Sequence, residues 1–334
     1  MRKITTSLVG LMMLLTACSK KDIKVADAEP AVPEMESARQ CASSEVLDRQ
    51  ISEDPKRADF LAELEEKTRL YPGRENGIFR GVGMLYIPVV IHVVSSANVT
   101  DAQIQRQIDV LNKDFTKTNS ELSNSSVYLA NYSFASVANC QINFVVTQVI
   151  RRSTTATFGT NDAVKKTSMG GSDPVNATTH LNFWVADLSS GLLGYAQFPG
   201  GSASTDGIVV DYQAFGTAAT YPMYSQFNLG RTATHEVGHW VNLRHIWGDT
   251  RCGNDQVTDT PAHDGSNGGC PAVGLKSACQ GKPLEQWMNY MDYTDDRCMY
   301  MFSGGQKTRM DAAVDGARLA YVRTTKPTPA TGFQ

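Results

Sequence analysis

Eleven residues, from His235 to His245, constrain the fold and chemistry of this chain more than any other stretch. They contain three of the six histidines, and Glu236 directly follows the first of them. On a helix, positions i and i+4 lie one turn apart on the same face, so His235 and His239 can bind one ion. His245 comes later, so the chain must leave the helix and turn back to bring a third imidazole to the same point.

The spacing predicts a catalytic zinc site with His235, His239 and His245 as ligands. Three protein ligands leave the fourth position of a tetrahedral zinc ion open to water. Glu236 stands where it can reach that water. A bare HExxH motif often arises by chance, but the third histidine at this distance extends it to the metzincin signature.

One position departs from that signature. Asn242 occupies the place of the usual glycine, which lets the helix end with a positive φ. Asparagine is the non-glycine residue that best tolerates the left-handed region, so we expect Asn242 to make the turn between the last two histidines.

The segments around the histidine motif resemble the pappalysin family of metzincins. The resemblance covers roughly residues 37–320 and rests on Ile87–Val94, Gly230–Thr234, Asp259-Thr260-Pro261, Asn289-Tyr290-Met291-Asp292-Tyr293 and Cys298-Met299. It implies that Met291 forms a hydrophobic floor under the zinc. It also implies that Tyr293 stands beside the metal and helps to stabilise the tetrahedral intermediate. Without the zinc motif, both would be interpreted as core residues.

The resemblance implies a metzincin-like fold of the α/β (α+β) class. The upper lobe has a twisted five-stranded sheet with helices, and the lower lobe is mostly irregular with a C-terminal helix. In the family the substrate lies antiparallel to an edge strand above the zinc. We expect 192–198 to be that strand, because an open edge offers backbone groups to an extended peptide. An ordinary edge strand is an equally good interpretation.

Local patterns predict the elements of such a fold. The apolar run Leu85–Val94 favours a strand buried on both faces. Asp101 can cap a helix in which Ile104, Ile108, Leu111 and Phe115 fall on one stripe. Further strands are expected at 141–150, 180–185 and 207–212, the zinc helix at about 228–242, and a last helix from about Ser303.

The N-terminus indicates export. Residues 1–17 read as a lipoprotein signal peptide, in which Arg2 and Lys3 precede an apolar run too short for a mature membrane helix. The run ends in Leu15-Thr16-Ala17-Cys18, which resembles a lipobox and implies a lipid on Cys18. The chain would then be a bacterial cell-envelope lipoprotein, in the outer membrane or at the surface, held only by its acyl chains. An ordinary signal peptide with an incidental cysteine is the alternative, and release after processing stays open.

Four segments are expected after the signal. Residues 18–36 are polar and predict a flexible tether. Residues 37–80 predict a pro-region, in which Asp54-Pro55 opens a charged helix toward Leu70. Residues 81–323 suffice for one bilobal catalytic domain, and 324–334 are expected to be a disordered tail.

The seven cysteines fit an oxidising compartment. Four of them follow the histidine motif, at positions 252, 270, 279 and 298. Because no two are spaced as CxxC, disulfides are favoured over a second structural metal site. Spacing leaves three pairings open. The resemblance implies the crossed one, Cys252–Cys279 and Cys270–Cys298.

Cys41 lies in Arg39-Gln40-Cys41-Ala42, which resembles the segment where pappalysins carry a cysteine switch. Its thiolate would bind the zinc, displace the catalytic water and keep the enzyme latent. We expect an exposed stretch around Arg74 to Arg80, before the first strand, and cleavage there would release the pro-region. The competing interpretation pairs Cys41 with Cys140 in a third disulfide.

Three aspartates follow His245 in a Gly-rich loop, at positions 249, 255 and 259. Oxygen ligands spaced in this way suit calcium. Because pappalysins bind calcium near their Asp-Thr-Pro segment, Asp259 is the candidate ligand. A solvated acidic loop is the alternative.

The sequence therefore predicts a zinc endopeptidase that acts on protein or peptide substrates, with Glu236 as general base. Two alternatives stay open, namely a catalytically inactive zinc-binding or adhesion lipoprotein and a zinc hydrolase of non-peptide substrates. The formal net charge of −3 and the lack of a basic stripe argue against a nucleic-acid partner.

Overall fold

The structure is a computed structural model and describes residues 39–124 and 137–334. The predicted signal peptide, the lipidated Cys18 and the tether lie outside the described residues. No helix in these two ranges is long and apolar enough to cross a membrane.

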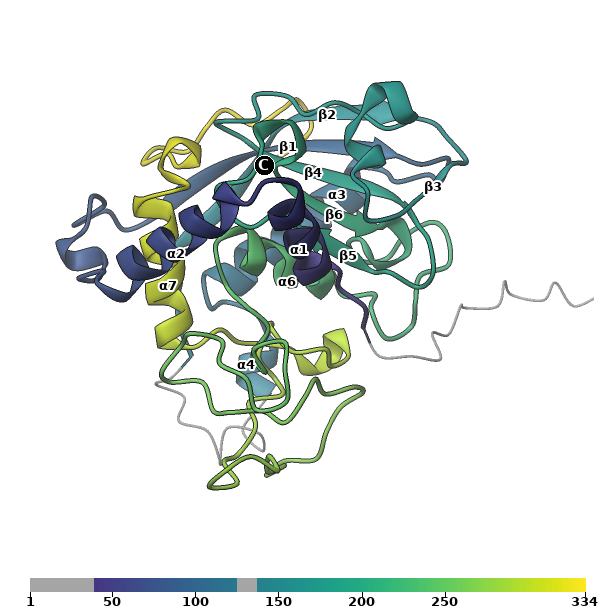
Figure 1. Ribbon diagram of the computed structural model, residues 1–334. Helices are drawn as coiled ribbons and strands as arrows, with labels where there is room; N and C mark the ends of the chain where they lie inside the picture. Colours follow the sequence, from purple (N-terminus) through teal and green to yellow (C-terminus); the bar gives the residue numbers. More distant parts are fainter. Residues whose placement is uncertain (1–38, 125–136) are drawn as a thin grey trace, which may run out of the picture. The chain divides into compact units, whose positions relative to one another are not determined.

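A mixed sheet forms the upper lobe (Figure 1). Its strands are β1 (Leu85–Val94), β2 (Ile142–Arg152), β3 (Thr157–Phe158), β4 (Leu181–Leu188), β5 (Gly194–Ala196) and β6 (Ile208–Asp211). The main path runs β2-β1-β4-β6-β5, and β3 pairs with β4 off this path. The predicted five-stranded sheet is confirmed as that path. Only β5 is antiparallel to its neighbour, and it lies at the edge as expected.

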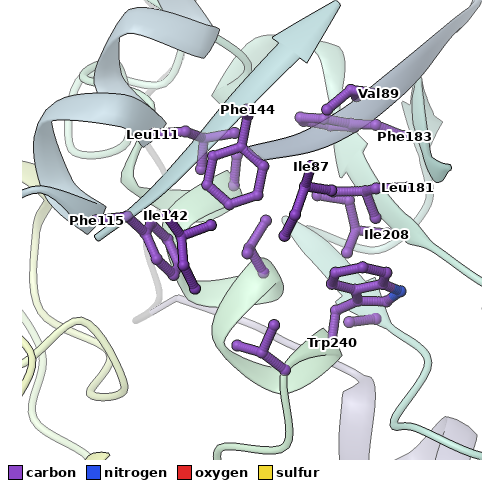
Figure 2. Close-up of a cluster of buried hydrophobic side chains, with 14 of the residues drawn as sticks. Ile87, Val89, Leu111, Phe115, Ile142, Phe144, Leu181, Phe183, Ile208 and Trp240 are labelled. Atoms are coloured by element: carbon purple, nitrogen blue, oxygen red, sulfur yellow. The ribbon is translucent and has the colours of Figure 1, made fainter. Parts of the chain in front are cut away.

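The core lies between the sheet and two helices, α3 (Asp101–Phe115) and α6 (Arg231–Trp240). Figure 2 shows Ile87 of β1, Phe144 of β2, Leu111 of α3 and Trp240 of α6 converging in one cluster. All four are buried, and burying side chains of this size contributes about 1.5–3 kcal/mol each. This packing fixes α6, and with it the histidine motif, against the sheet.

Helix α3 begins one residue earlier than the sequence suggests, because Thr100 and not Asp101 is its N-cap. The Thr100 hydroxyl accepts a hydrogen bond from the Gln103 N–H at 3.2 Å, which satisfies one of the free N–H groups of the first turn. Asp101 is the first helical residue, where its negative charge interacts favourably with the helix dipole.

The segment predicted as a pro-region, hereafter called the pro-region, forms two helices, α1 (Ser43–Glu53) and α2 (Lys56–Arg69). A short 3-10 helix, η1 (Arg74–Asn76), follows them. Only the second helix was expected. Asp54 accepts a hydrogen bond from the Lys56 N–H at 3.2 Å, so the Asp-Pro pair does open α2. Helix α1 contacts β5, and α2 contacts α7 (Gly304–Asp315). The two pro-region helices therefore cover the edge strand and the C-terminal helix (Figure 1).

The lower lobe begins where α6 ends. The chain from 241 to 303 is mostly irregular, as expected, and leads into α7. The remaining short elements are α4 (Glu121–Asn124), η3 (Ala163–Lys165), η4 (Thr167–Met169), η5 (Ala203–Thr205), η6 (Tyr212–Ala214), η7 (Asp296–Cys298) and η8 (Leu319–Tyr321).

The C-terminal segment differs from the expected disordered tail. The Ala330 N–H donates to the Val146 carbonyl at 2.8 Å, and the Gln334 N–H donates to Gln105 of α3 at 3.0 Å. Ala330 and Phe333 also pack against the main core. These few apolar contacts hold a segment that its composition alone does not mark as ordered.

Candidate metal centre and active site

Helix α6 carries the histidine motif and is buried along its whole length. It is shorter than the expected 228–242. Its N-cap residue, Gly230, has no side chain that could accept a hydrogen bond from the N–H groups of the first turn. The Asp296 carboxylate accepts hydrogen bonds from the Leu229 N–H at 2.9 Å and the Arg231 N–H at 3.2 Å instead. Asp296, which lies far along the chain, thus pairs with free N–H groups at the start of the helix.

Three imidazoles converge at the end of this helix. The Nε2 atom of His239 lies 3.1 Å from Nε2 of His235 and 3.1 Å from Nε2 of His245. Together with the Cys41 sulfur, their ligand atoms all lie within 4.8 Å of one another.

The opposite nitrogen of each ring faces an acceptor. Nδ1 of His235 lies 2.7 Å from the Tyr290 carbonyl, and Nδ1 of His239 lies 2.9 Å from the Leu243 carbonyl. Nδ1 of His245 contacts the Asp249 carboxylate. Carbonyl and ionised carboxylate oxygens only accept, so each Nδ1 carries the proton and each Nε2 keeps its lone pair.

This arrangement fits a zinc ion. Burial lowers the pKa of His235, and that of His239 to about 3, which keeps both rings neutral. Three lone pairs at 3.1 Å repel one another unless a cation lies among them. Burial and the nearby Glu236 carboxylate raise the pKa of the Cys41 thiol, so only a cation would favour its thiolate. Neutral imidazoles and a thiolate are the ligands that zinc prefers.

Asn242 makes the turn between the second and third histidines. It adopts a φ of +76°, the left-handed conformation expected of it. The Leu243 N–H donates to the Gly238 carbonyl at 2.8 Å, and the Asn242 N–H donates to the His239 carbonyl at 2.9 Å. These two bonds form a Schellman motif, which ends the helix and directs His245 back toward the site.

Met291 lies against α6 at Gly238. A Cβ atom on Gly238 would lie only 2.4 Å from the Met291 sulfur, so any larger residue here would displace the Met291 side chain from α6. Met291 is fully buried, and its carbonyl accepts a hydrogen bond from the Ile246 N–H at 3.1 Å. The contact links the turn around Met291 to both the zinc helix and the loop that carries His245.

Glu236 and Tyr293 flank the imidazole cluster. Burial raises the pKa of Glu236 to about 7, and its Oε2 accepts a hydrogen bond from the Ser43 hydroxyl at 2.9 Å. The Tyr293 hydroxyl donates to the Cys41 carbonyl at 3.2 Å and lies 3.2 Å from Nε2 of His245. Burial raises the pKa of Tyr293, so its phenol stays protonated and able to donate.

The segment around Cys41 pairs in parallel with the edge strand β5 through a single bridge to Gly194. The Leu193 N–H donates to the Gln40 carbonyl at 2.9 Å, and the Ala42 N–H donates to the Gly194 carbonyl at 3.1 Å. Cys41 and Cys140 are both free thiols. The structure therefore does not contain the alternative Cys41–Cys140 disulfide, because Cys41 faces the imidazoles while Cys140 is buried in the core.

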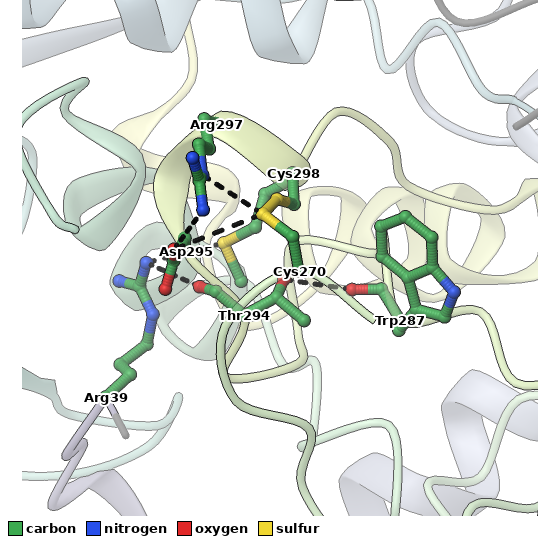
Figure 3. The surroundings of a disulfide bond; sticks show 8 residues. Arg39, Cys270, Trp287, Thr294, Asp295, Arg297 and Cys298 are labelled. Atoms are coloured by element: carbon green, nitrogen blue, oxygen red, sulfur yellow. Dashed lines mark hydrogen bonds and ion pairs between the residues drawn. A yellow bond between two sulfur atoms is a disulfide. The ribbon is translucent and has the colours of Figure 1, made fainter. Parts of the chain in front are cut away.

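Arg39 of this segment fills a buried pocket. Its guanidinium donates to Asp296 at 2.6 Å and to the Thr232 hydroxyl at 2.8 Å. It also donates to the Thr294 carbonyl at 3.4 Å and lies 4.9 Å from the centroid of the Phe227 ring. Arg39 is only 1% exposed. Figure 3 shows this side chain next to Thr294.

Both crossed disulfides, Cys252–Cys279 and Cys270–Cys298, are present in the structure. The second one borders the pocket of Arg39, because η7 carries both Cys298 and Asp296. The Asp295 N–H donates to the Gly269 carbonyl at 2.9 Å and joins the same two segments. The disulfide thus ties η7 to the loop around Cys270.

The three loop aspartates have separate partners. Asp259 accepts hydrogen bonds from the Ser303 hydroxyl at 2.7 Å and the Gly305 N–H at 2.8 Å, at the start of α7. Asp255 binds Thr260, and Asp249 binds His245. Within the described ranges, they form no joint group of metal-binding oxygens. Calcium at Asp259 stays a prediction.

The expected cleavage stretch is only partly accessible. Arg74 is buried, and its guanidinium binds Asp311 and the Cys140 carbonyl. Arg80 and Gly81 are exposed. The expectation that Arg74 lies in an exposed stretch is therefore wrong, because this arginine anchors the pro-region to α7.

Sequence reasoning missed Asp296, Ser43 and the role of Asp249. Arg39 and Asp296 are 257 positions apart, so no local pattern joins them. Asp249 was assigned only as a possible calcium ligand, although its spacing of four residues from His245 was a usable signal.

We predict that Asp249→Asn weakens zinc binding by about 10- to 100-fold, because it removes the charged acceptor that orients His245. The check is the zinc dissociation constant of the folded protein, measured by competition with a chromophoric chelator. Asp109→Asn, which changes an exposed carboxylate on α3, serves as control. Equal affinities in both variants would contradict this role.

Comparisons with known proteins agree with this geometry. The family model described as pregnancy-associated plasma protein-A, of the M43 peptidases, matches residues 167–315. An extracellular metalloprotease of Verticillium alfalfae is 32% identical over 239 residues, which cover 69% of this chain and 77% of the relative. One of Pyricularia oryzae is 32% identical over 241 residues, which cover 68% and 74%.

Two solved structures are also similar. A promirolysin mutant of Tannerella forsythia matches with a TM-score of 0.73 and 36% identity, over 85% of this chain and 97% of that one. Mature mirolysin of the same organism, in complex with a cleaved peptide, matches with a TM-score of 0.63 and 38% identity, over 71% and 97%.

Proposed function

The chain belongs to the pappalysin family of zinc metalloproteases, and we propose that it is an exported endopeptidase made in a latent form, with Glu236 as general base. The observation that carries the proposal is the meeting of three imidazole lone pairs, a buried carboxylate and a protonated phenol beside an edge strand.

The edge strand β5 supplies the peptide-binding surface. The backbone groups of Leu193 and Gly194, which pair with the pro-region in the latent chain, would pair with an extended substrate. One of the similar structures is mature mirolysin in complex with a cleaved peptide. We propose that this chain likewise cleaves peptides bound along β5.

Each flanking side chain has a defined task. A zinc ion bound by His235, His239 and His245 would polarise the scissile carbonyl and lower the pKa of water. Glu236 takes the proton from the attacking water and passes it to the leaving amine. Tyr293 donates a hydrogen bond to the oxygen that becomes negative in the transition state.

Replacing Glu236 by alanine should abolish peptide hydrolysis while the protein still folds and binds one zinc, because the glutamate carries protons and is no metal ligand. The measurements are turnover of a generic protein substrate and zinc content by mass spectrometry. Asp109→Ala is the control. Turnover in Glu236→Ala, or loss of zinc, would contradict the assignment. Absence of turnover in the wild type after removal of the pro-region would favour an inactive zinc-binding protein.

Latency is proposed to come from Cys41 and its neighbours. The thiolate would take the fourth position on zinc. The Ser43 hydroxyl donates a hydrogen bond to the Glu236 carboxylate, so this carboxylate would be less available to accept a proton from water. The segment runs parallel to β5, opposite to the antiparallel course expected of a substrate, so its peptide bonds are reversed relative to the catalytic groups. The likeness to promirolysin, which covers more of this chain than mature mirolysin does, supports a pro-region here.

Cys41→Ala should therefore give activity in the uncleaved precursor or faster activation. The time course of substrate cleavage and pro-region loss after purification measures this. Cys140→Ala removes the other free thiol and should leave latency unchanged. Identical time courses for Cys41→Ala and the wild type would exclude the switch.

The pocket of Arg39 suggests the substrate class. Arg39 precedes Cys41, and the substrate is expected to run in the opposite direction, so the pocket would take the side chain on the C-terminal side of the cleaved bond. Asp296, which is buried and binds the guanidinium at 2.6 Å, favours a cation there. We propose that the enzyme cleaves before arginine or lysine.

Asp296→Asn should lower kcat/KM for such peptides by about 10- to 100-fold relative to matched glutamine peptides, because a charge-assisted hydrogen bond is lost. Asparagine keeps an oxygen that can accept from the N–H groups at the start of α6. Asp295→Asn, beside the exposed Arg297, is the matched control. An unchanged arginine-to-glutamine ratio in Asp296→Asn would contradict the pocket assignment.

Export through a lipidated Cys18 is proposed from the sequence alone. The relatives are called extracellular metalloproteases, which agrees with secretion in general. Labelled palmitate should enter the wild type and not Cys18→Ala; label in both, or in neither, would exclude the lipid.

Calcium near Asp259 is also proposed, and thermal unfolding with and without a calcium chelator tests it.

A further inference from the structure

A buried arginine of the lower lobe is paired with a carboxylate of the pro-region. Arg309 of α7 is only 3% exposed. Its two terminal nitrogens lie 2.5 Å and 2.6 Å from the two oxygens of Glu65 on α2. This fork-to-fork geometry is the strongest and most specific way in which proteins bind a carboxylate.

The guanidinium is held by the catalytic domain itself. Nε of Arg309 donates to the Asn242 carbonyl at 2.6 Å, and this bond does not involve the pro-region. When the pro-region leaves, the fork loses its carboxylate but keeps its orientation. A guanidinium held in this orientation is preorganised for a bidentate contact, so the emptied fork favours another carboxylate.

A second cation lies beside the fork. Nη2 of Arg244 is 3.9 Å from the same Glu65 carboxylate, and this arginine is 44% exposed. It belongs to the short segment between Asn242 and His245. The two arginines that face the Glu65 carboxylate therefore come from two different segments, α7 and the turn of the zinc site.

This position is continuous with the active site. A cavity of about 230 Å³ is lined by Glu65 and Arg244 and also by Ser44 and Asp249. Asp249 contacts the ligand His245. A wider cavity of about 720 Å³ between α2 and α7 includes Arg309, so there is room for a peptide beside the fork.

The direction of the chain assigns the side of the cleft. The pro-region runs parallel to β5 at Cys41, opposite to the expected course of a substrate. The cavity beside Glu65 and Arg244 is also lined by Phe198, which follows the C-terminal end of β5. A substrate antiparallel to β5 reaches that end of the strand with its upstream residues, so this position lies on the N-terminal side of the bond to be cleaved.

We propose that Arg309 and Arg244 form a carboxylate-binding subsite of the mature enzyme, which recognises an acidic side chain of the substrate upstream of the cleaved bond. Glu65 fills this subsite in the latent chain. The inference rests on the proposed protease function and adds a second specificity element to it.

The test uses the activated wild-type enzyme and pairs of peptides that differ only by Glu or Gln, with the acidic residue moved through successive upstream positions. At one position the Glu peptide should have a KM about 10-fold lower than its Gln partner, as expected for a charge-assisted bidentate contact. The preference should be lost in Arg309→Gln and reduced in Arg309→Lys and Arg244→Gln. Arg251→Gln, an exposed arginine of the same loop, should retain it.

Each outcome decides one claim. If the wild type cleaves none of the peptides, the proposed function fails. If it cleaves them with equal KM for Glu and Gln at every position, only the subsite is wrong. The subsite is also wrong if the preference survives unchanged in Arg244→Gln and Arg309→Lys, or if intact-mass measurement shows the cleaved pro-region still bound while the enzyme is active. Should Arg309→Gln fail to fold, the exposed Arg244→Gln still decides.

Discussion

The structure depends on three imidazole rings whose Nε2 lone pairs meet at one point and whose Nδ1 atoms are each fixed by a hydrogen bond. Each ring is fixed through its other nitrogen, by the Tyr290 carbonyl, the Leu243 carbonyl and the Asp249 carboxylate. The three acceptors come from the turn around Met291, the end of α6 and the loop after His245. The zinc site can therefore form only when all three segments are in place, which links metal binding to folding of the lower lobe.

The rotation of α6 is fixed by a buried ion pair with α3. Asp114 of α3 accepts hydrogen bonds from Arg231 at 2.8 Å and from Thr234 at 2.6 Å. Burial nevertheless raises the pKa of Asp114 to about 6. Removing either partner would leave a buried charge without compensation, which is strongly destabilising. Helix α6 is thus held by apolar packing, by Asp296 at its start and by Asp114 on its side.

The pro-region is complementary to the working parts of the catalytic domain, contact by contact. Cys41 faces the imidazoles, Ser43 binds Glu236 and Arg39 binds Asp296. Arg74, in contrast, binds Asp311 of α7, away from the groups assigned to catalysis. Under the proposed latency, contacts of the first kind would block function, and contacts of the second kind would only hold the pro-region. The proposal therefore uses the first kind of contact as a guide to the substrate.

The sequence predicted those features that depend on local patterns. The continuous apolar run Leu85–Val94 predicted both ends of β1 correctly. The i, i+4 histidines predicted the zinc helix, although α6 ends two residues before the expected 242, and Asn242 predicted the turn after it. Helix α1 was missed because few of its residues are buried and docking onto β5 stabilises it. The pairs Arg39–Asp296 and Glu65–Arg309 join residues 257 and 244 positions apart, and no periodicity encodes such contacts.

The most direct test of the central claim is X-ray absorption spectroscopy at the zinc edge on the purified full-length precursor. We expect one zinc with three nitrogen ligands at about 2.0–2.1 Å and one sulfur ligand at about 2.3 Å, with the sulfur absent from Cys41→Ala. A first shell of nitrogen and oxygen only in the wild type, or a protein without zinc, would contradict the account.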